Sequence, residues 1–482
     1  MNWLLIAEIV YLAILVLVCI RIIYDTRSNT KTLAYLLLAI FIPVVGVIFY
    51  FSFGINYRKR KIYTKKLITD TAMAGVLNEE ILRRSKHTLQ HSDIAQTNKE
   101  LAYMLAKDIG STLTAGNNVR LLVNGENKFP EVMRALEAAR SHIHIEYYIY
   151  EDGEIGRAIE AVLIRKAQEG VTVRFIYDAF GSRSIRKELV PRLKAAGVQA
   201  FPFYEILFIA LANRLNYRNH RKIIVVDGRV AFIGGINVSD RYINGQNTKL
   251  FWRDTHLLIE GPGVQYLQYL FLCDWNFCAG ERILPDRGFF PDPASLHPKG
   301  NKVVQIAASG PDSDTPTILF SLLQAINLAT TEVLITTPYF IPGESLMDAL
   351  IVASLGGVSV KLLVPGVSDS RIVNAAARSY YGDLLNAGVE IYLYRKGFLH
   401  AKTLVADRKL AVVGTANMDY RSFDLNFEVN AIVYDDQLAG ELCAIFYEDI
   451  KDAEKITAGE WNARPVHRQL IEKTARLISP LL

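Results

Sequence analysis

Two halves of the chain carry the same order of sequence elements, and this internal duplication restricts the possible folds more than any other feature. The matching pairs of segments are SHIHIEYYIY (141–150) with TEVLITTPYF (331–340), VTVRFIYDAFG (171–181) with VSVKLLVPGV (358–367), and LKAAGVQAFPF (193–203) with LLNAGVEIYLY (384–394). Apolar, strand-like runs alternate in both halves with amphipathic helical stretches. The pattern predicts an α/β fold of two tandem sheet-and-helix halves, with a parallel or mixed sheet in each.

A short polar motif stands at the same place in each half. His220 and Lys222 are spaced by two, so on a strand their side chains share one face, and His400 and Lys402 repeat this spacing. A lone histidine on a strand is usually structural, but two copies at matching places in a duplicated chain indicate a function. If the halves meet face to face, two imidazoles and two ammonium groups surround one pocket, which suits phosphoryl transfer.

A turn and a returning strand follow each motif. Asp227 and Asp407 stand in the turns, where aspartate is common for backbone reasons, so we expect them to hold the motif in shape more than to transfer protons. Asn237 and Asn417 follow small residues on the returning strands. Lysine and asparagine can bind non-bridging phosphate oxygens, while one histidine attacks phosphorus and the other protonates the leaving oxygen.

The segments HRKIIVVD (220–227) and HAKTLVAD (400–407) match the paired HxKxxxxD signature, so the chain resembles the phospholipase D superfamily from about residue 115 to 482. The resemblance implies one active site between the halves, a transient phosphohistidine, and no metal or other cofactor. It implies a catalytic set of His220, Lys222, Asp227, His400, Lys402 and Asp407, and a phosphate-binding set of Lys222, Asn237, Lys402 and Asn417.

In that superfamily an acidic residue further along the chain orients each histidine, and the matching positions are Asp254 in FWRDTHLLIEG and Glu428 in LNFEVNAIVYD. A carboxylate on one ring nitrogen fixes the tautomer and makes the other nitrogen a better base or nucleophile. From the sequence alone, a surface carboxylate is an equal alternative at both positions.

Two apolar runs precede the duplicated part, at about residues 4–23 and 33–53, and each has the length of a transmembrane helix. A signal peptide is disfavoured because the start has no basic residues and a second run follows, and buried core helices are the other alternative. Basic residues crowd positions 58–66, so the positive-inside rule predicts that the remaining chain faces the cytoplasm. We therefore expect a multi-pass protein of the inner, cytoplasmic membrane.

These features predict four parts: a transmembrane hairpin (1–57), a basic and helical linker (58–118), a first half (119–300) and a second half (301–482). The hairpin and the segments YRNHRKIIVVDG, WRDTH and TPYFIP resemble bacterial cardiolipin synthases. This resemblance implies that a phosphatidyl group passes from one phosphatidylglycerol to another, giving cardiolipin and glycerol. Our hypothesis is that His220 attacks phosphorus and His400 protonates the departing glycerol.

Other functions remain open at the level of the sequence. The motifs equally fit a phospholipase D hydrolase or a transferase with another alcohol acceptor. A nuclease is disfavoured because the net charge is only +5 and no long basic and aromatic track is present, so we expect no nucleic-acid partner. A scaffold with a decayed site is disfavoured by intact motifs.

The apolar segment 201–215 is either a core element or an interfacial element that feeds lipid to the site.

Overall fold

The computed structural model describes residues 3–26, 29–51, 85–203, 217–245, 250–280, 283, 288–291 and 299–479. Two features of the sequence analysis, the basic residues 58–66 and positions 204–215 of the apolar segment, lie outside these residues.

The strands of the two halves correspond one to one over most of their length. In the first half they are β1 (Thr114–Val123), β2 (His142–Tyr147), β3 (Thr172–Asp178), β4 (Gln199–Phe203), β5 (Arg218–Asn219), β6 (Lys222–Val226), β7 (Val230–Gly234), β8 (Phe251–Arg253) and β9 (Thr255–Glu260). In the second half they are β10 (Lys302–Ser309), β11 (Glu332–Thr336), β12 (Phe340–Ile341), β13 (Ser359–Pro365), β14 (Glu390–Tyr394), β15 (Gly397–Leu399), β16 (Thr403–Ala406), β17 (Leu410–Gly414), β18 (Met418–Asp419), β19 (Asn426–Tyr434) and β20 (Ala453–Ile456).

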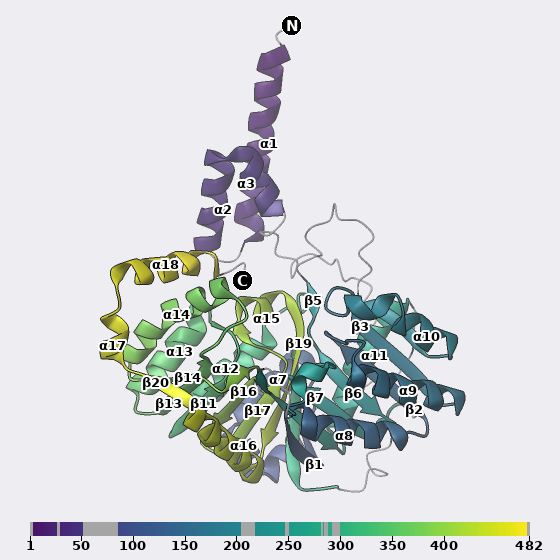
Figure 1. The fold of residues 1–482 in the computed structure, drawn as a ribbon. Helices are drawn as coiled ribbons and strands as arrows, with labels where there is room; N and C mark the ends of the chain where they lie inside the picture. Colours follow the sequence, from purple (N-terminus) through teal and green to yellow (C-terminus); the bar gives the residue numbers. More distant parts are fainter. Residues whose placement is uncertain are drawn as a thin grey trace.

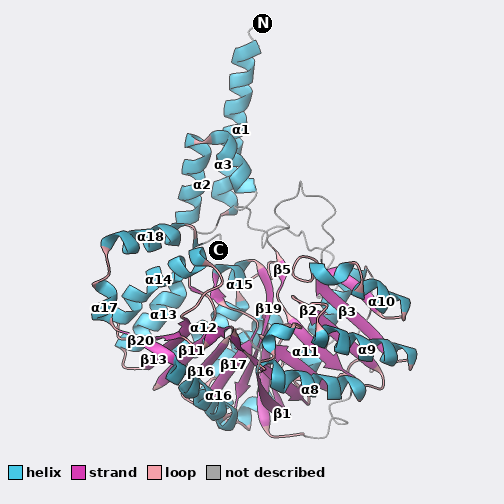
Figure 2. Ribbon diagram, in the orientation of Figure 1, coloured by secondary structure: helices cyan, strands magenta, loops and turns pink. Residues whose placement is uncertain are grey.

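One mixed sheet of 16 strands runs through both halves (Figure 2), in the order β20-β14-β13-β11-β16-β17-β19-β10-β1-β9-β7-β6-β2-β3-β4, with β5 paired to β19. At its centre β1 pairs antiparallel with β10, and the strand order on one side of this seam mirrors the order on the other. The sequence predicted a sheet in each half, and the structure joins the two sheets into one. The seam therefore fixes how the halves, and their motifs, face each other.

Helices cover both faces of the sheet (Figure 1), and the buried side chains show which helix covers which face. On one face α8 (Asn124–Glu137), α9 (Glu154–Gln168) and α10 (Leu189–Ala195) cover the first half. On the same face α12 (Thr317–Leu328), α13 (Glu344–Leu355) and α14 (Arg371–Asn386) cover the second. On the other face α11 (Val264–Ala279) and α16 (Asp436–Asp449) share one core cluster across the seam. The remaining helices of the catalytic part are α15 (Tyr420–Asp424), α17 (Ala458–Asn462) and α18 (Val466–Leu477).

In the segment expected to be a helical linker, the described residues are helical as far as Ile109, and α7 belongs to the core of the second half. Leu101 and Leu105 on α7 (Lys99–Ile109), which follows α6 (Asp93–Thr97), are buried in the same cluster as α12 and α13. The side-chain amide of Gln305 donates to the carbonyls of Ala102 at 3.1 Å and Ser111 at 2.9 Å. The sheet of the first half begins with β1 at Thr114, slightly before the expected boundary at residue 119.

The N-terminal helices stand away from the sheet as a hairpin (Figure 1), made of α1 (Trp3–Asp25), α2 (Asn29–Phe41) and α3 (Pro43–Phe49). The second apolar run was expected to form one helix, but it breaks at Ile42 because Pro43 starts a new helix at its first position. Over the residues described, the structure contains no helix whose length and apolar character suffice to cross a membrane.

Candidate active site

Each histidine is held in place by a short strand that pairs with the opposite half. β5, just before His220, runs parallel to β19, and β15, just before His400, runs parallel to β8. The backbone N–H of His220 donates to the carbonyl of Phe427 at 2.9 Å, and that of His400 donates to the carbonyl of Arg253 at 2.7 Å. The predicted strand, turn and return strand then follow as β6–β7 and β16–β17. The two motifs thus meet at the seam.

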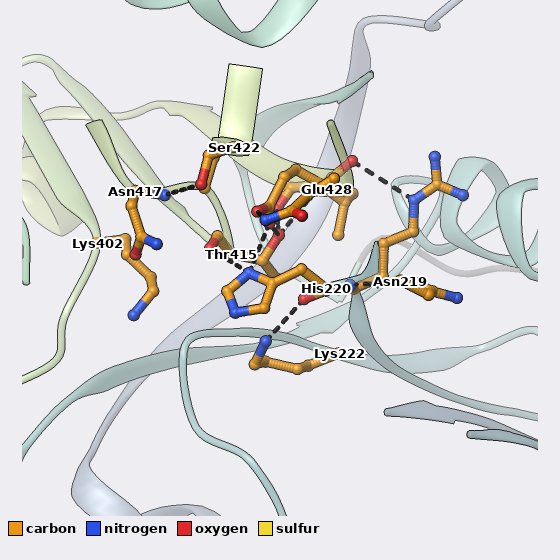
Figure 3. Close-up of polar contacts among 12 residues, drawn as sticks. Asn219, His220, Lys222, Lys402, Thr415, Asn417, Ser422 and Glu428 are labelled. Atoms are coloured by element: carbon orange, nitrogen blue, oxygen red, sulfur yellow. Dashed lines mark hydrogen bonds and ion pairs between the residues drawn. The ribbon is translucent and has the colours of Figure 1, made fainter. Parts of the chain in front are cut away.

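The orienting carboxylates are exchanged between the halves. Nδ1 of His220 lies 2.9 Å from Oε2 of Glu428, and Nδ1 of His400 lies 2.7 Å from Oδ2 of Asp254 (Figure 3 shows the first pair). Glu428 belongs to the second half and Asp254 to the first, so each half orients the histidine of the other. When Nδ1 donates its proton to the carboxylate, Nε2 carries the lone pair that can attack phosphorus or accept a proton.

Both carboxylates are buried and held by further hydrogen bonds. The hydroxyl of Thr415 donates to Oε2 of Glu428 at 2.5 Å, and the backbone N–H of Thr255 donates to Oδ1 of Asp254 at 2.7 Å. Burial acts to raise the pKa of Glu428, but His220 and Lys222 together keep it below its ordinary value. Glu428 therefore stays ionised beside its histidine.

Burial favours the neutral form of both catalytic rings. It is the main cause that lowers the pKa of His220, and it lowers the pKa of His400 to about 3, with Lys402 as the second cause. The Nζ of Lys402 lies 3.1 Å from Nδ1 of His400, whereas Nδ1 of His220 faces two acceptors, Glu428 and the carbonyl of Thr415 at 3.1 Å. The two rings therefore differ in surroundings although their motifs match.

Each lysine donates a hydrogen bond to the backbone carbonyl of the histidine in its own motif. Nζ of Lys222 donates to the carbonyl of His220 at 2.7 Å, and Nζ of Lys402 donates to that of His400. Burial lowers the pKa of Lys222 to about 7 and that of Lys402 to about 8, and the charge of Lys402 also acts to lower the pKa of Lys222. An anion that binds between the two ammonium groups offsets this cost, so the site favours a phosphate group.

The two asparagines lie next to the motifs but differ in their hydrogen bonds. The amide of Asn237 is engaged, because its N–H donates to the hydroxyl of Tyr242 at 2.8 Å and its oxygen accepts from the backbone of Ile149 at 3.2 Å. Among the described residues, the side-chain oxygen of Asn417 is buried without a hydrogen-bond partner. Figure 3 places Asn417 beside Lys402, where its amide can turn to a bound group.

Asp227 and Asp407 lie at the opposite ends of β6 and β16 from the histidines. Both have positive φ, at 53° and 52°. The carboxylate of Asp227 accepts from the backbone of residues 140, 141 and 142 at 2.9, 2.8 and 2.9 Å. The carboxylate of Asp407 accepts from the backbone of residues 330, 331 and 332 at 2.8, 2.8 and 3.0 Å. These contacts tie each turn to the start of a neighbouring strand, β2 or β11.

Several residues near the site have no sequence signal of their own. Lys128 on α8 is buried, and its Nζ donates to the hydroxyl of Tyr147 and the carbonyl of Ile236, both at 2.8 Å. Burial lowers its pKa well below the ordinary value. In the sequence, Lys128 resembles any other charge on an amphipathic helix, so its burial is evident only from the fold.

Two arginines flank Tyr148, whose ring packs edge-on against His220 at 4.9 Å between centroids. The guanidinium of Arg218 lies over the ring of Phe180 at 4.4 Å, and burial lowers the pKa of Arg218, with Arg421 acting in the same direction. Among the described residues, neither arginine forms an ion pair with a carboxylate. Their positions, two before His220 and four after Asn417, are the only signal that the sequence offers.

Two known protein families match parts of this chain. The chain matches the family described as "Cardiolipin synthase, PLD-like domain" at residues 132–260 and 322–450, one match in each half. Residues 13–54 match the family "Phospholipase_D-nuclease N-terminal".

Full-length relatives and one solved structure are also similar to the chain. It is 40% identical over 468 residues to "Cardiolipin synthase 2" of Bacillus cereus, which covers 96% of this chain and 88% of the relative. It is 40% identical over 473 residues to "Major cardiolipin synthase ClsA" of Bacillus subtilis, which covers 97% of each. The phosphatidylserine synthase of Haemophilus influenzae shares the fold, with a TM-score of 0.59 at 13% identity over 80% of this chain and 100% of that one.

Proposed function

Because the chain belongs to the family of PLD-like cardiolipin synthases, we propose that it joins two phosphatidylglycerol molecules into cardiolipin and releases glycerol. The chain is a phosphatidyltransferase. The observation that carries the proposal is the crossed site itself: two neutral imidazoles, each oriented by a buried carboxylate of the other half, with two buried lysines beside them. This arrangement suits two successive displacements at one phosphorus atom.

In the first displacement, Nε2 of His220 attacks the phosphorus of one phosphatidylglycerol. An N–P bond forms as the P–O bond to glycerol breaks, and the protonated ring of His400 gives its proton to the departing oxygen. The negative charge of the bound phosphodiester favours the protonated form of His400 and so opposes burial, which lowers the pKa of this ring. Glu428 stabilises the positive charge on the phosphorylated His220 ring.

In the second displacement, a glycerol hydroxyl of another phosphatidylglycerol gives its proton to the neutral ring of His400 and attacks the phosphohistidine. The N–P bond breaks, cardiolipin forms, and both rings return to their starting states. Lys222, Lys402 and Asn417 bind the non-bridging oxygens in both steps, and Asn237 positions the loop that carries it. Label found on His400 after trapping the phosphoenzyme would exchange the two histidine roles.

Both substrates of this reaction are anionic, and two arginines near His220 suit them. Arg218 and Arg421 supply positive charge beside Tyr148 without a carboxylate ion pair among the described residues. Such charge draws anionic headgroups to the site and favours them over zwitterionic ones. Water competes with the lipid hydroxyl, so a hydrolase remains the alternative function.

We also propose that the N-terminal hairpin inserts into the inner membrane and leaves the catalytic part in the cytoplasm. The support is the large number of exposed apolar side chains on its outside: Ile9, Leu12, Leu17, Ile23, Leu33, Phe41, Val44 and Ile48. In water such a surface is unfavourable, whereas lipid tails cover it at no cost. Resistance of the full chain to extraction from membranes by alkaline carbonate tests this proposal, and release into the wash would contradict it.

The deciding experiment for the reaction is product analysis of the purified full chain. The protein receives phosphatidylglycerol alone in mixed micelles, beside a His220→Ala control, and lipids are separated by thin-layer chromatography and identified by mass spectrometry. We expect cardiolipin and glycerol with the native chain and neither with the variant. Phosphatidic acid without cardiolipin would make the enzyme a hydrolase.

A further inference from the structure

The helix α18 is oriented opposite to an ordinary surface helix: its polar face packs against the protein and its apolar face is exposed. Its polar face packs on the protein: the carboxylate of Glu472 is buried, and it accepts hydrogen bonds from Arg378 at 3.0 Å and from Arg464 at 2.8 and 2.9 Å. The guanidinium of Arg476 lies over the ring of Tyr380 on α14 at 4.2 Å. A surface helix ordinarily buries its apolar stripe and exposes its charges.

The opposite face of α18 is apolar and open. Its exposed side chains are Val466 at 80%, Leu470 at 64%, Ile471 at 62%, Leu477 at 80% and the adjoining Ile478 at 42%. The spacing of 466, 470 and 477 places three of them in one row along the helix, and the row lies opposite Glu472. The exposed Lys473 falls within this row, between Leu470 and Leu477, whereas the exposed Arg468 lies on the other side of the helix.

The helix α18 lies at the end of the catalytic part that is closest to the N-terminal hairpin. Figure 1 shows α18 at the end of the catalytic part nearest the base of α2, with its axis running across the direction of α1. A helix in this orientation lies along the surface of a membrane that the hairpin enters. An exposed apolar row that includes a lysine suits a helix in a bilayer interface, because the lysine side chain can extend its charge to the headgroups.

Exposed apolar side chains also lie at the edge of the sheet where the parallel strands β3 and β13 have their carboxyl ends. Phe180 follows the carboxyl end of β3, and Val367 follows the carboxyl end of β13, its counterpart in the second half. Both are exposed, as is Ile372 on the first turn of α14. The motif histidines lie at this edge too, since Lys222 pairs with Tyr147 at the carboxyl end of β2.

We propose that α18 is an interfacial helix: its apolar face enters the headgroup region of the bilayer and holds the edge of the sheet that carries the motif histidines close to the lipid surface. This inference rests on the proposed function, because it is the supply of phospholipid to that site that α18 would serve. The occupant of the face is the lipid bilayer, because α18 lies at the end of the catalytic part nearest the hairpin, with its axis across that of α1, and because Lys473 within the apolar row suits anionic lipid.

The test compares two double variants of the full chain in proteoliposomes of phosphatidylglycerol and phosphatidylcholine. Leu470→Ser with Leu477→Ser removes apolar surface from α18. Val352→Ser with Leu355→Ser removes equally exposed apolar surface from the end of α13, which leads into the amino end of β13, away from the site. Each protein is assayed on long-chain phosphatidylglycerol in the bilayer and on short-chain, water-soluble phosphatidylglycerol.

We expect the α18 variant to lose about fivefold or more of the turnover on bilayer substrate while it retains turnover on soluble substrate. The α13 variant should match the native chain on both. Equal turnover of the α18 variant and native chain on bilayer substrate would overturn the inference. A native chain that makes no cardiolipin from either substrate would instead contradict the proposed function.

A second measurement reports on the helix without activity. A polarity-sensitive fluorophore at Leu470→Cys should shift to the blue and be quenched by nitroxide lipids, whereas the same label at Val352→Cys should not. The absence of quenching at position 470 would overturn the inference. Dimers in detergent that the α18 variant alone fails to form would show that a second copy of the chain, rather than lipid, covers the face.

Discussion

Asp254 and Glu428 differ by one methylene group, yet each carboxylate reaches Nδ1 of a histidine from the other half at 2.7 and 2.9 Å. We expect Asp254→Asn and Glu428→Gln to lower kcat by roughly 100- to 10,000-fold with little change in KM, because an amide cannot stabilise a charged ring or fix its tautomer in the same way. Steady-state assays on phosphatidylglycerol in micelles measure both constants.

The matched control for these variants is Glu260→Gln, at the far end of β9 from Asp254, where the carboxylate accepts a hydrogen bond from Asn118. It removes a carboxylate from the same strand region and should leave kcat unchanged. A loss below about tenfold in both site variants would show that the carboxylates only support the fold.

The lysines predict how activity depends on pH. Lys222 and Lys402, with pKa values lowered to about 7 and about 8, bind phosphate in their charged forms. The charged form is complete below the lower value, so kcat/KM should fall as pH rises through about 7 to about 8, and it should fall further above that. The measurement is kcat/KM on phosphatidylglycerol between pH 6 and about 9. A flat profile over this range would mean that the lysines keep ordinary pKa values in the working enzyme.

At this scale the sequence predicted which residues gather but not how they pair. His220, His400 and the two lysines were evident because each motif repeats at a matching place. The sequence did not predict that Asp254 and Glu428 each orient the histidine of the other half, because this depends on how the two halves of the chain pack together. Arg218, Arg421 and Lys128 were missed since a single charge on a helix or short strand resembles any solvated charge.

At the level of elements, the turns that carry Asp227 and Asp407 brace one strand against the next. We expect Asp407→Asn to lower the free energy of unfolding by about 1–3 kcal/mol, because an amide accepts fewer of the backbone hydrogen bonds that the carboxylate now accepts. Asparagine tolerates positive φ, so the turn itself can persist and kcat below the melting temperature should be close to native. Thermal unfolding in detergent and activity at low temperature check this.

The same aspartate predicts a sensitivity to acid. Burial acts to raise the pKa of Asp407, but hydrogen bonds from residues 330–332 hold it below the ordinary value. A lowered folded-state pKa contributes stability that is present above the unfolded pKa and is lost as pH falls through the folded one. The Asp407→Asn difference in Tm should therefore shrink in acid, whereas an exposed control, Asp436→Asn, should show no difference at any pH.

Element boundaries were predictable where local chemistry sets them. The strand, turn and return strand of each motif follow from alternating apolar residues and a turn aspartate. The second N-terminal run reads as one helix in hydropathy, but Pro43 lacks a backbone N–H and the helix restarts there. Placement of α7 in the core of the second half needed the tertiary structure, because its polar composition resembles that of a linker.

At the scale of the whole molecule, the β1–β10 seam makes one enzyme from two halves that each hold half of the site. We expect His220→Ala and His400→Ala proteins, mixed in the same micelles, to remain inactive. Each chain carries both rings of its own site, so a chain that lacks one ring cannot use the ring of another chain. Product analysis of the mixture against each variant alone provides the measurement. Recovered cardiolipin synthesis would mean that halves exchange between chains.

The exchange of carboxylates across the seam also constrains how such a chain can evolve. In two independent copies of an enzyme, one copy can drift while the other keeps the activity. Here a loss at Glu428 disables the ring of the first half, and a loss at Asp254 disables that of the second. Gene duplication, which elsewhere gives a spare, has in this chain produced two parts under a single selective pressure, each preserved by the needs of the other.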